Sequence, residues 1–203
     1  MLFRHLFYCK YVERCLCRVW ISNKIAKTFT HEVAMSYRQA FSLRQRMLDC
    51  IQHLAYYMMV EVIEPNWLTF LNKMSKVSNV DDVLSVHQDL QDSYLKECML
   101  TDPDLLACIT GICAVCIEFC NFMQVDSADT SKETAGSFED TIISLDEKFT
   151  QVLMRLLDRV CNLDCDNSNE KLLNVFCRLD FNLFYTDILI RRGKERTSQD
   201  VSG

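Results

Sequence analysis

Turn-forming residues are almost absent from this chain, and this scarcity restricts its fold more than any other feature. The 203 residues include only 4 Gly and 2 Pro, whereas average usage would give about 14 and 10. Sheets and hairpins depend on tight turns, which need these residues. The apolar content of 49% supplies a full core, enough for one large domain or two small ones. We therefore predict an all-α fold, a helical bundle of about eight helices.

The longest helical pattern includes the stretch from Leu43 to Trp67. Its apolar residues recur at steps of three and four, which places them on one face of a helix: Leu43, Met47, Ile51, Leu54, Met58 and Val62. Flanking apolar residues widen this stripe, as is typical of a helix packed in the middle of a helical domain. We expect this helix to be scaffold without catalytic chemistry.

The ends of this helix follow from its flanks. The pattern extends back to about His31, which predicts a helix about 50 Å long and leaves room for a kink or short break near Ser36 or Ser42. We expect the helix to end near Glu64, because Pro65 disfavours helical backbone angles in the residue before it.

Further apolar stripes predict helices over 2–27, 66–77 and 170–179. Three more follow polar residues suited to capping a helix N-terminus: Asn79 with Asp82, Thr101 ahead of Asp102 and Pro103, and Ser137 with Asp140. A last segment around 184–189 completes the expected set, with Asp180 or Asn182 as its cap.

One plain linker divides the chain. Residues 125–136, VDSADTSKETAG, are polar and end in Gly. We assign residues 1–196 to one domain that contains this linker and 197–203 to a disordered tail. The first helix opens without a capping sequence, so we expect the domain to be N-terminally truncated at Met1.

The net charge of −6 is unevenly spread. Residues 1–50 carry nine Lys or Arg and three Asp or Glu, whereas residues 51–150 carry five and seventeen. The basic first quarter therefore faces either an acidic partner or the acidic middle of the chain itself. The sequence leaves both alternatives open.

The 12 Cys residues prompt the question of a metal or redox site. Cys113, Cys116 and Cys120 have the core spacing of a helix, no second C-x-x-C exists, and the four His are widely scattered. Zinc sites need four ligands, so we expect no metal or cofactor and interpret these residues as buried thiols. A redox or metal protein built on the Cys-rich helix at 108–120 is the alternative that elemental analysis would test. No signal peptide or membrane span is evident, and we expect a reducing, intracellular setting.

Catalytic and nucleic-acid motifs are also missing from the sequence. It contains no G-x-S-x-G, Walker or G-x-G-x-x-G pattern, so we expect a protein that is not an enzyme. We interpret His87, on an apolar stripe, as a partly buried residue with one hydrogen-bond partner. The acidic balance and the absence of a basic patch disfavour nucleic-acid binding.

Four long blocks, in order along the chain, resemble a known family. They are FRHLFYCKYVERCLCRVWISNK at 3–24, LRQRMLDCIQHLAYYMMVEVIEPNW at 43–67, NVDDVLSVHQDLQDSYLKECMLTDPDLL at 79–106 and RLDFNLFYTD at 178–187. These blocks resemble the C-terminal half of the gamma-tubulin complex component (Spc97/Spc98) family, in particular its component 2 branch.

The resemblance implies a scaffold that binds gamma-tubulin. In this family an N-terminal domain makes lateral contacts with other gamma-tubulin complex components, and the C-terminal domain binds gamma-tubulin. The assembled complexes nucleate microtubules at centrosomes and spindle poles, the microtubule organising centres of the cytoskeleton and cytoplasm. The chain resembles the later part of the C-terminal domain, so lateral contacts would need the missing N-terminal domain. No nucleic acid or membrane partner is implied.

Polar positions in two of these blocks are our candidates for contacting gamma-tubulin: Arg44, Arg46, Arg178, Asp180 and Asn182. The alternative for each is that it caps a helix or makes an internal salt bridge. A generic helical adaptor without specificity for gamma-tubulin is the alternative function.

Overall fold

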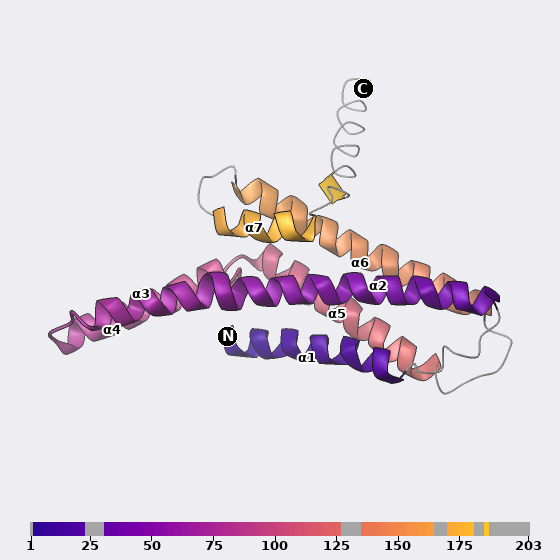
Figure 1. Ribbon diagram of the computed structural model, residues 1–203. Coiled ribbons are helices and arrows are strands. Elements are labelled where there is room, and N and C mark those ends of the chain that lie inside the picture. Colours follow the sequence, from indigo (N-terminus) through magenta and orange to yellow (C-terminus); the bar gives the residue numbers. More distant parts are fainter. Residues whose placement is uncertain (1, 23–30, 127–134, 165–169, 181–184, 187–203) are drawn as a thin grey trace, which may run out of the picture.

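All regular elements in the computed structural model are helical, for the residues it describes: 2–22, 31–126, 135–164, 170–180 and 185–186. They are α1 (Leu2–Ser22), α2 (His31–Tyr56), the π-helical segment η2 (Tyr57–Ile63), α3 (Glu64–Met74), α4 (Val80–Glu97), α5 (Pro103–Asp126), α6 (Ala135–Asp164) and α7 (Glu170–Leu179). The all-α prediction is confirmed (Figure 1).

Several predicted boundaries were close. Helix α7 has the predicted bounds, and α1 ends at Ser22, beyond which residues 23–27 lie outside the described part. Helix α6 begins at Ala135, so the predicted cap Ser137 lies within the helix. Helices α5 and α6 each extend two residues into the predicted linker. The rest of that linker, most of the predicted last segment and the tail lie outside the described residues.

Helix α2, η2 and α3 form one unbroken rod from His31 to Met74, which crosses the whole molecule (Figure 1). At 1.5 Å per residue it is about 66 Å long. The predicted end near Glu64 was wrong, because the helix passes through Pro65, and the structure has no break at Ser36 or Ser42.

The π-helical segment is what admits Pro65. The N–H of Glu64 donates to the carbonyl oxygen of Met59, five residues earlier, instead of the usual four. A new α-helix then starts at Glu64 with the proline in its first turn, where its missing N–H costs nothing. The side-chain amide of Asn66 donates to the Val62 carbonyl at 2.9 Å and satisfies a second backbone group of the wide turn.

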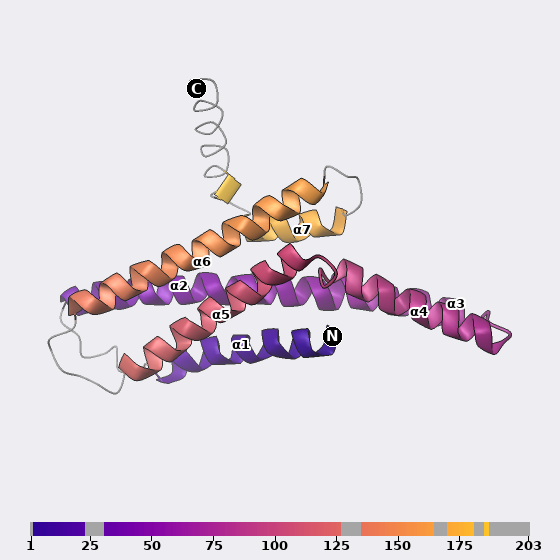
Figure 2. The ribbon, with the colours of Figure 1, turned by 180° about the vertical axis from the view of Figure 1, so that it is seen from behind.

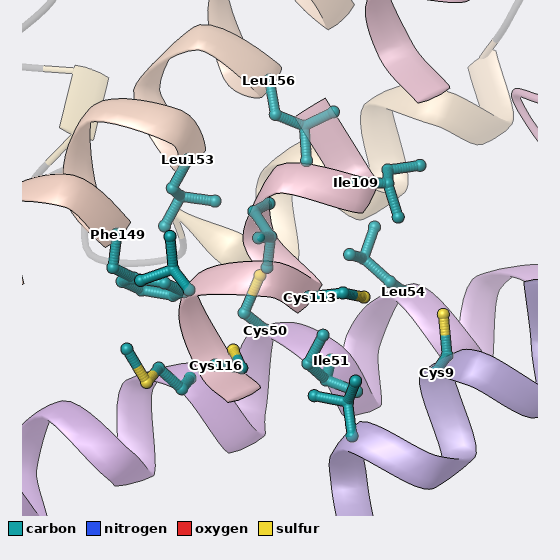
Figure 3. Close-up of a cluster of buried hydrophobic side chains, with 14 of the residues drawn as sticks. Cys9, Cys50, Ile51, Leu54, Ile109, Cys113, Cys116, Phe149, Leu153 and Leu156 are labelled. Carbon is teal, nitrogen blue, oxygen red and sulfur yellow. The ribbon is translucent and has the colours of Figure 1, made fainter. Parts of the chain in front are cut away.

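The core lies where α2 meets α1, α5 and α6. All six residues of the predicted stripe are buried, five of them with no exposed area. In Figure 3, Ile51 and Leu54 of this stripe lie in one cluster with side chains of α5 and α6, including Ile109, Phe149 and Leu153. Burying each such side chain stabilises the fold by about 1.5–3 kcal/mol, so the rod is the common support of the other helices.

Helix α5 is the most apolar element. By length and composition, residues 103–124 would suffice to cross a membrane, and half of that window is buried inside the chain. In the structure α5 packs against α6 on one side and α1 on the other. A helix that is packed at the centre of a bundle can be as long and as apolar as one that crosses a membrane.

Helix α4 ends in a reverse turn that leads directly into α5. The N–H of Leu100 donates to the Leu95 carbonyl at 2.9 Å and that of Met99 to the Lys96 carbonyl at 3.2 Å, the two bonds of a Schellman motif. Met99 occupies the left-handed position with φ 61°, where glycine is usual. Its side chain is 1% exposed, and that burial offsets the backbone strain.

The cap of α5 differs from the prediction. The Asp102 carboxylate, and not the Thr101 hydroxyl, accepts the N–H groups of Asp104 and Leu105, at 2.9 and 3.0 Å. Arg159 of α6 also donates to it at 3.0 Å. Burial acts to raise the pKa of Asp102, but the N–H of Leu105, the Arg159 guanidinium and the N–H of Asp104 outweigh it, so the pKa lies below its ordinary 3.8.

Two substitutions of Asp102 separate its cap from its charge. We expect Asp102→Ala to lower the free energy of unfolding by about 1–2 kcal/mol, because it removes the cap and the ion pair. Asp102→Asn keeps a capping acceptor and should lose less, about 0.5 kcal/mol. Urea unfolding followed by circular dichroism measures both values.

The same variants predict a dependence on pH. A lowered pKa in the folded state means that the charge stabilises the protein at neutral pH and that this contribution is lost as the pH falls through the folded pKa, below 3.8. The difference in the free energy of unfolding between the native protein and Asp102→Asn should therefore shrink toward zero in acid. If this difference in the free energy of unfolding is the same at every pH, the Asp102 charge is not its cause.

Candidate protein-binding surfaces

Arg46 connects three parts of the chain. Its guanidinium donates to Asp146 Oδ1 at 2.5 Å, Thr150 Oγ1 at 3.0 Å and the Tyr185 hydroxyl at 2.8 Å. It also lies 5.7 Å from the ring centre of Phe149. Burial acts to lower the pKa of Arg46, but Tyr185 and Asp146 outweigh it and raise the pKa. Its side chain is 32% exposed. The main role of Arg46 is therefore to connect α2 with α6 inside the protein.

Arg178 has a similar role between α7 and the rod. It forms an ion pair with Glu61 of η2 and lies 4.7 Å from the ring centre of Tyr56. Its side chain is 33% exposed. Arg44, by contrast, is 7% exposed, and its Nε donates to the Leu16 carbonyl of α1 at 2.8 Å.

Asp180 fixes the chain after α7. Its carboxylate is 1% exposed and accepts the N–H groups of Tyr185 and Thr186, at 2.8 and 2.7 Å, and the Thr186 hydroxyl. Asn182 lies outside the described residues. Arg46 and Arg178 thus make the internal ion pairs, and Asp180 the capping contacts, that were weighed as the alternative, whereas the contact of Arg44 is with a backbone carbonyl of α1. For all four, a contact with gamma-tubulin stays a prediction.

Helices α3 and α4 form a hairpin that projects beyond the rest of the bundle (Figures 1 and 2). Helix α3 has no buried residue, and α4 has one, Leu90. Of the thirteen large apolar side chains exposed in the described part of the chain, eight lie on the hairpin and the adjoining rod: Tyr56, Met59, Val60, Trp67, Leu68, Leu71, Val80 and Leu84. We call these eight residues the hairpin surface. Exposed apolar groups gathered in this way are typical of a surface that binds another protein.

Hydrogen bonds hold the base of the hairpin. The buried Tyr57 donates to the Glu97 carbonyl at 2.9 Å, and Tyr94 donates to the Ile63 carbonyl at 3.3 Å. The Asn66 amide contacts the Glu97 carboxylate at 3.2 Å. At the far end the predicted cap is confirmed, since Asn79 Oδ1 accepts the Asp82 N–H at 2.8 Å. The hairpin is thus held at its base by hydrogen bonds to α4, while the eight side chains of the hairpin surface stay exposed.

The sequence did not reveal this surface. Trp67 and Leu71 belong to the stripe predicted for the helix at 66–77, yet both are about half exposed. His87 was wrongly predicted to be partly buried, because it is exposed beside the ring of Phe70, 6.4 Å away. The signal in the sequence is that apolar residues continue past Pro65 at helical spacing.

Three cysteine residues of α5 are buried in the core. Cys113, Cys116 and Cys120 are at most 1% exposed, as predicted for core thiols. Burial raises the pKa of Cys120 and of Cys50 to about 12, so both thiols are protonated at neutral pH. Among the described residues, no three His, Cys, Asp or Glu lie in an arrangement suited to a metal ion.

Comparison with known proteins gives one consistent result. Residues 1–185 match the family model described as "Gamma tubulin complex component C-terminal". The chain is 41% identical to the gamma-tubulin complex component 2 homolog of Drosophila melanogaster over 92% of this chain and 26% of that protein. It is 37% identical to gamma-tubulin complex component 2 of Mus musculus, over 98% and 27%. The spindle pole body component alp4 of Schizosaccharomyces pombe is 25% identical over 88% of this chain and 25% of that protein. The chain spans about a quarter of the length of these relatives.

The contacts of Arg46 predict a structural role that mutation can measure. We expect Arg46→Ala to lower the free energy of unfolding by about 1–3 kcal/mol, because three acceptors on other segments lose a charged donor. Arg38→Ala, on the exposed side of the same helix, should change it by less than about 0.5 kcal/mol. Equal effects of the two variants in urea unfolding would contradict this role.

Proposed function

Because this chain belongs to the gamma-tubulin complex component family, through its C-terminal domain, we propose that it is a gamma-tubulin-binding scaffold subunit that supports microtubule nucleation. The observation that carries this proposal is the family match over residues 1–185. Its place would be the microtubule organising centre, at centrosomes and spindle poles, in association with other gamma-tubulin complex components.

The proposed mechanism is positional and not catalytic. A rod about 66 Å long, on which α1, α5 and α6 pack, ends in a hairpin that hydrogen bonds hold at its base. A partner bound to that hairpin would be held in one orientation relative to the bundle. Orientation is what a nucleating scaffold must supply, because it has to align subunits before they polymerise.

We propose the hairpin surface as the main gamma-tubulin contact. Protein interfaces place aromatic and aliphatic anchors in their centres. The hairpin surface contains three such side chains that are exposed and do not belong to the core, Trp67, Leu68 and Leu84. Arg46 and Arg178 retain exposed edges, so they remain secondary candidates. Arg44 and Asp180 have little exposed surface to offer.

Capture of purified gamma-tubulin by the immobilised chain tests the proposed function. We expect gamma-tubulin to bind in preference to alpha/beta-tubulin, at salt low enough to preserve charge contacts. No capture by a chain that circular dichroism shows to be folded would exclude the function for this chain. Equal capture of both tubulins would favour a generic helical adaptor.

Substitution on the hairpin then tests its surface. We expect Leu68→Ser with Leu84→Ser to weaken binding of gamma-tubulin at least about tenfold, since each removes an exposed anchor. The side chains are 60% and 62% exposed, so the free energy of unfolding should change by less than about 0.5 kcal/mol each. Ile143→Ser on α6, 45% exposed, is the matched control. If this control weakens binding as much as the hairpin variants, the hairpin is not the contact.

A further inference from the structure

Helix α1 presents an outward face made of aromatic rings and arginines. Phe3, Arg4, Phe7, Tyr11 and Arg14 fall within about 100° of its circumference at 100° per residue. They lie opposite the core side of the helix, and all five are exposed. Phe3, Phe7 and Tyr11 are 73%, 63% and 57% exposed, although aromatic rings usually bury most of their surface. We call these five residues the α1 face.

A groove runs beside this face. Its volume is about 660 Å³, and it lies between Phe7, Tyr8 and Tyr11 of α1 and Leu100, Leu106 and Thr110 at the start of the α5 region. Arg4 also lines it. A cavity of this size, with apolar walls and a cation at its edge, accepts apolar side chains from a segment that carries acidic groups beside them.

Arg4 and Arg14 of α1 form no ion pair with the described residues of the acidic middle of the chain. The described ion pairs of residues 51–150 use other cations, namely Arg46, Lys73, Lys148, Arg159 and Arg178. On α1 the described pair is local, between Lys10 and Glu13 at 2.7 Å. Neither Arg4 nor Arg14 takes part in an ion pair within the described residues. The alternative in which the basic first quarter faces the chain's own acidic middle therefore does not account for these two arginines.

We propose that the α1 face and its groove form a docking site for an acidic amphipathic segment of another protein. Apolar side chains of that segment occupy the groove, and its carboxylates pair with Arg4 and Arg14. Aromatic residues and arginine are the residue types most enriched in the centres of protein interfaces. A nucleic acid fits less well, because Arg4 is the one arginine among the described residues that line the groove, and binding to a phosphate backbone needs a row of cations.

This site is separate from the hairpin surface and does not depend on binding of gamma-tubulin. The α1 face lies on another helix, and the residues that line the groove belong to α1, the α4–α5 turn and α5, not to α3 or α4. A failure of gamma-tubulin capture would therefore leave this proposal standing, and a failure here would leave the proposed function standing.

A defined peptide tests the proposal. The probe is a fluorescently labelled helical peptide with Leu along one side and Glu along the other, titrated with the whole chain by fluorescence anisotropy. The comparison probes are the same peptide with Lys in place of Glu, and a labelled oligothymidine. We expect the acidic peptide to bind, binding to weaken as salt is raised, and both comparison probes to bind at least about tenfold more weakly.

Two variants and a matched control locate the binding. Phe7→Ala with Tyr11→Ala removes the rings, and Arg4→Glu with Arg14→Glu reverses the charge; we expect each pair to weaken binding at least about tenfold. Arg38→Glu with Lys76→Glu reverses the same charge at exposed positions of α2 and the α3–α4 turn and should leave binding within about twofold. The far-UV circular dichroism and urea midpoint of each variant confirm its fold.

Hydrogen exchange of the native chain gives an independent measurement. The acidic peptide should protect amides of α1 and of residues 100–110, and leave α3 and α4 unchanged. The proposal is overturned by tighter binding of oligothymidine than of the peptide, by an equal effect of the control variant, or by protection elsewhere.

Discussion

The burial of one apolar stripe supports the whole molecule. Met47, Ile51, Leu54, Met58 and Val62 have no exposed surface, and α1, α5 and α6 all pack on the helix that carries them. A stripe that contacts three neighbours must be wide, and this one is widened by Leu48, Cys50 and Ala55. Close-packed interiors tolerate few voids, so the position of each surrounding helix is set by the side chains of this rod.

The same rod explains the exposed hairpin. The core ends at Val62, but the helix does not, because the π-helical turn shifts the backbone bonds and admits Pro65. The chain is therefore carried past its own core, and α4 returns along α3 before α5 re-enters the bundle at Asp102. The π turn thereby leaves Trp67 and Leu71 on a projection that the Tyr57 hydrogen bond holds at its base.

Polar side chains complete the fold by joining segments that are distant in sequence. Arg46 reaches α6 and Tyr185, Arg178 reaches η2, and Arg159 reaches the cap of α5. These pairs draw their carboxylates from the acidic middle and their cations from α2, α6 and α7. Arg4 and Arg14 of α1, which form no ion pair within the described residues, lie at the surface beside exposed aromatic rings. Several carboxylates of the acidic middle are thus paired within the chain, whereas two arginines of the basic first quarter are exposed at the surface.

The sequence by itself determined the helical class, most helix positions, the core stripe and the Asn79 cap. Each of these depends on neighbours within one or two turns, which the order of residues specifies directly. Only the tertiary structure decided the passage through Pro65, the cap at Asp102 and the internal contacts of Arg46 and Arg178. It also decided that Leu54 is buried while Leu68 and Leu84 are exposed. The two kinds of leucine follow the same helical spacing, and burial depends on whether another helix lies opposite, which is a property of chain segments far apart in sequence.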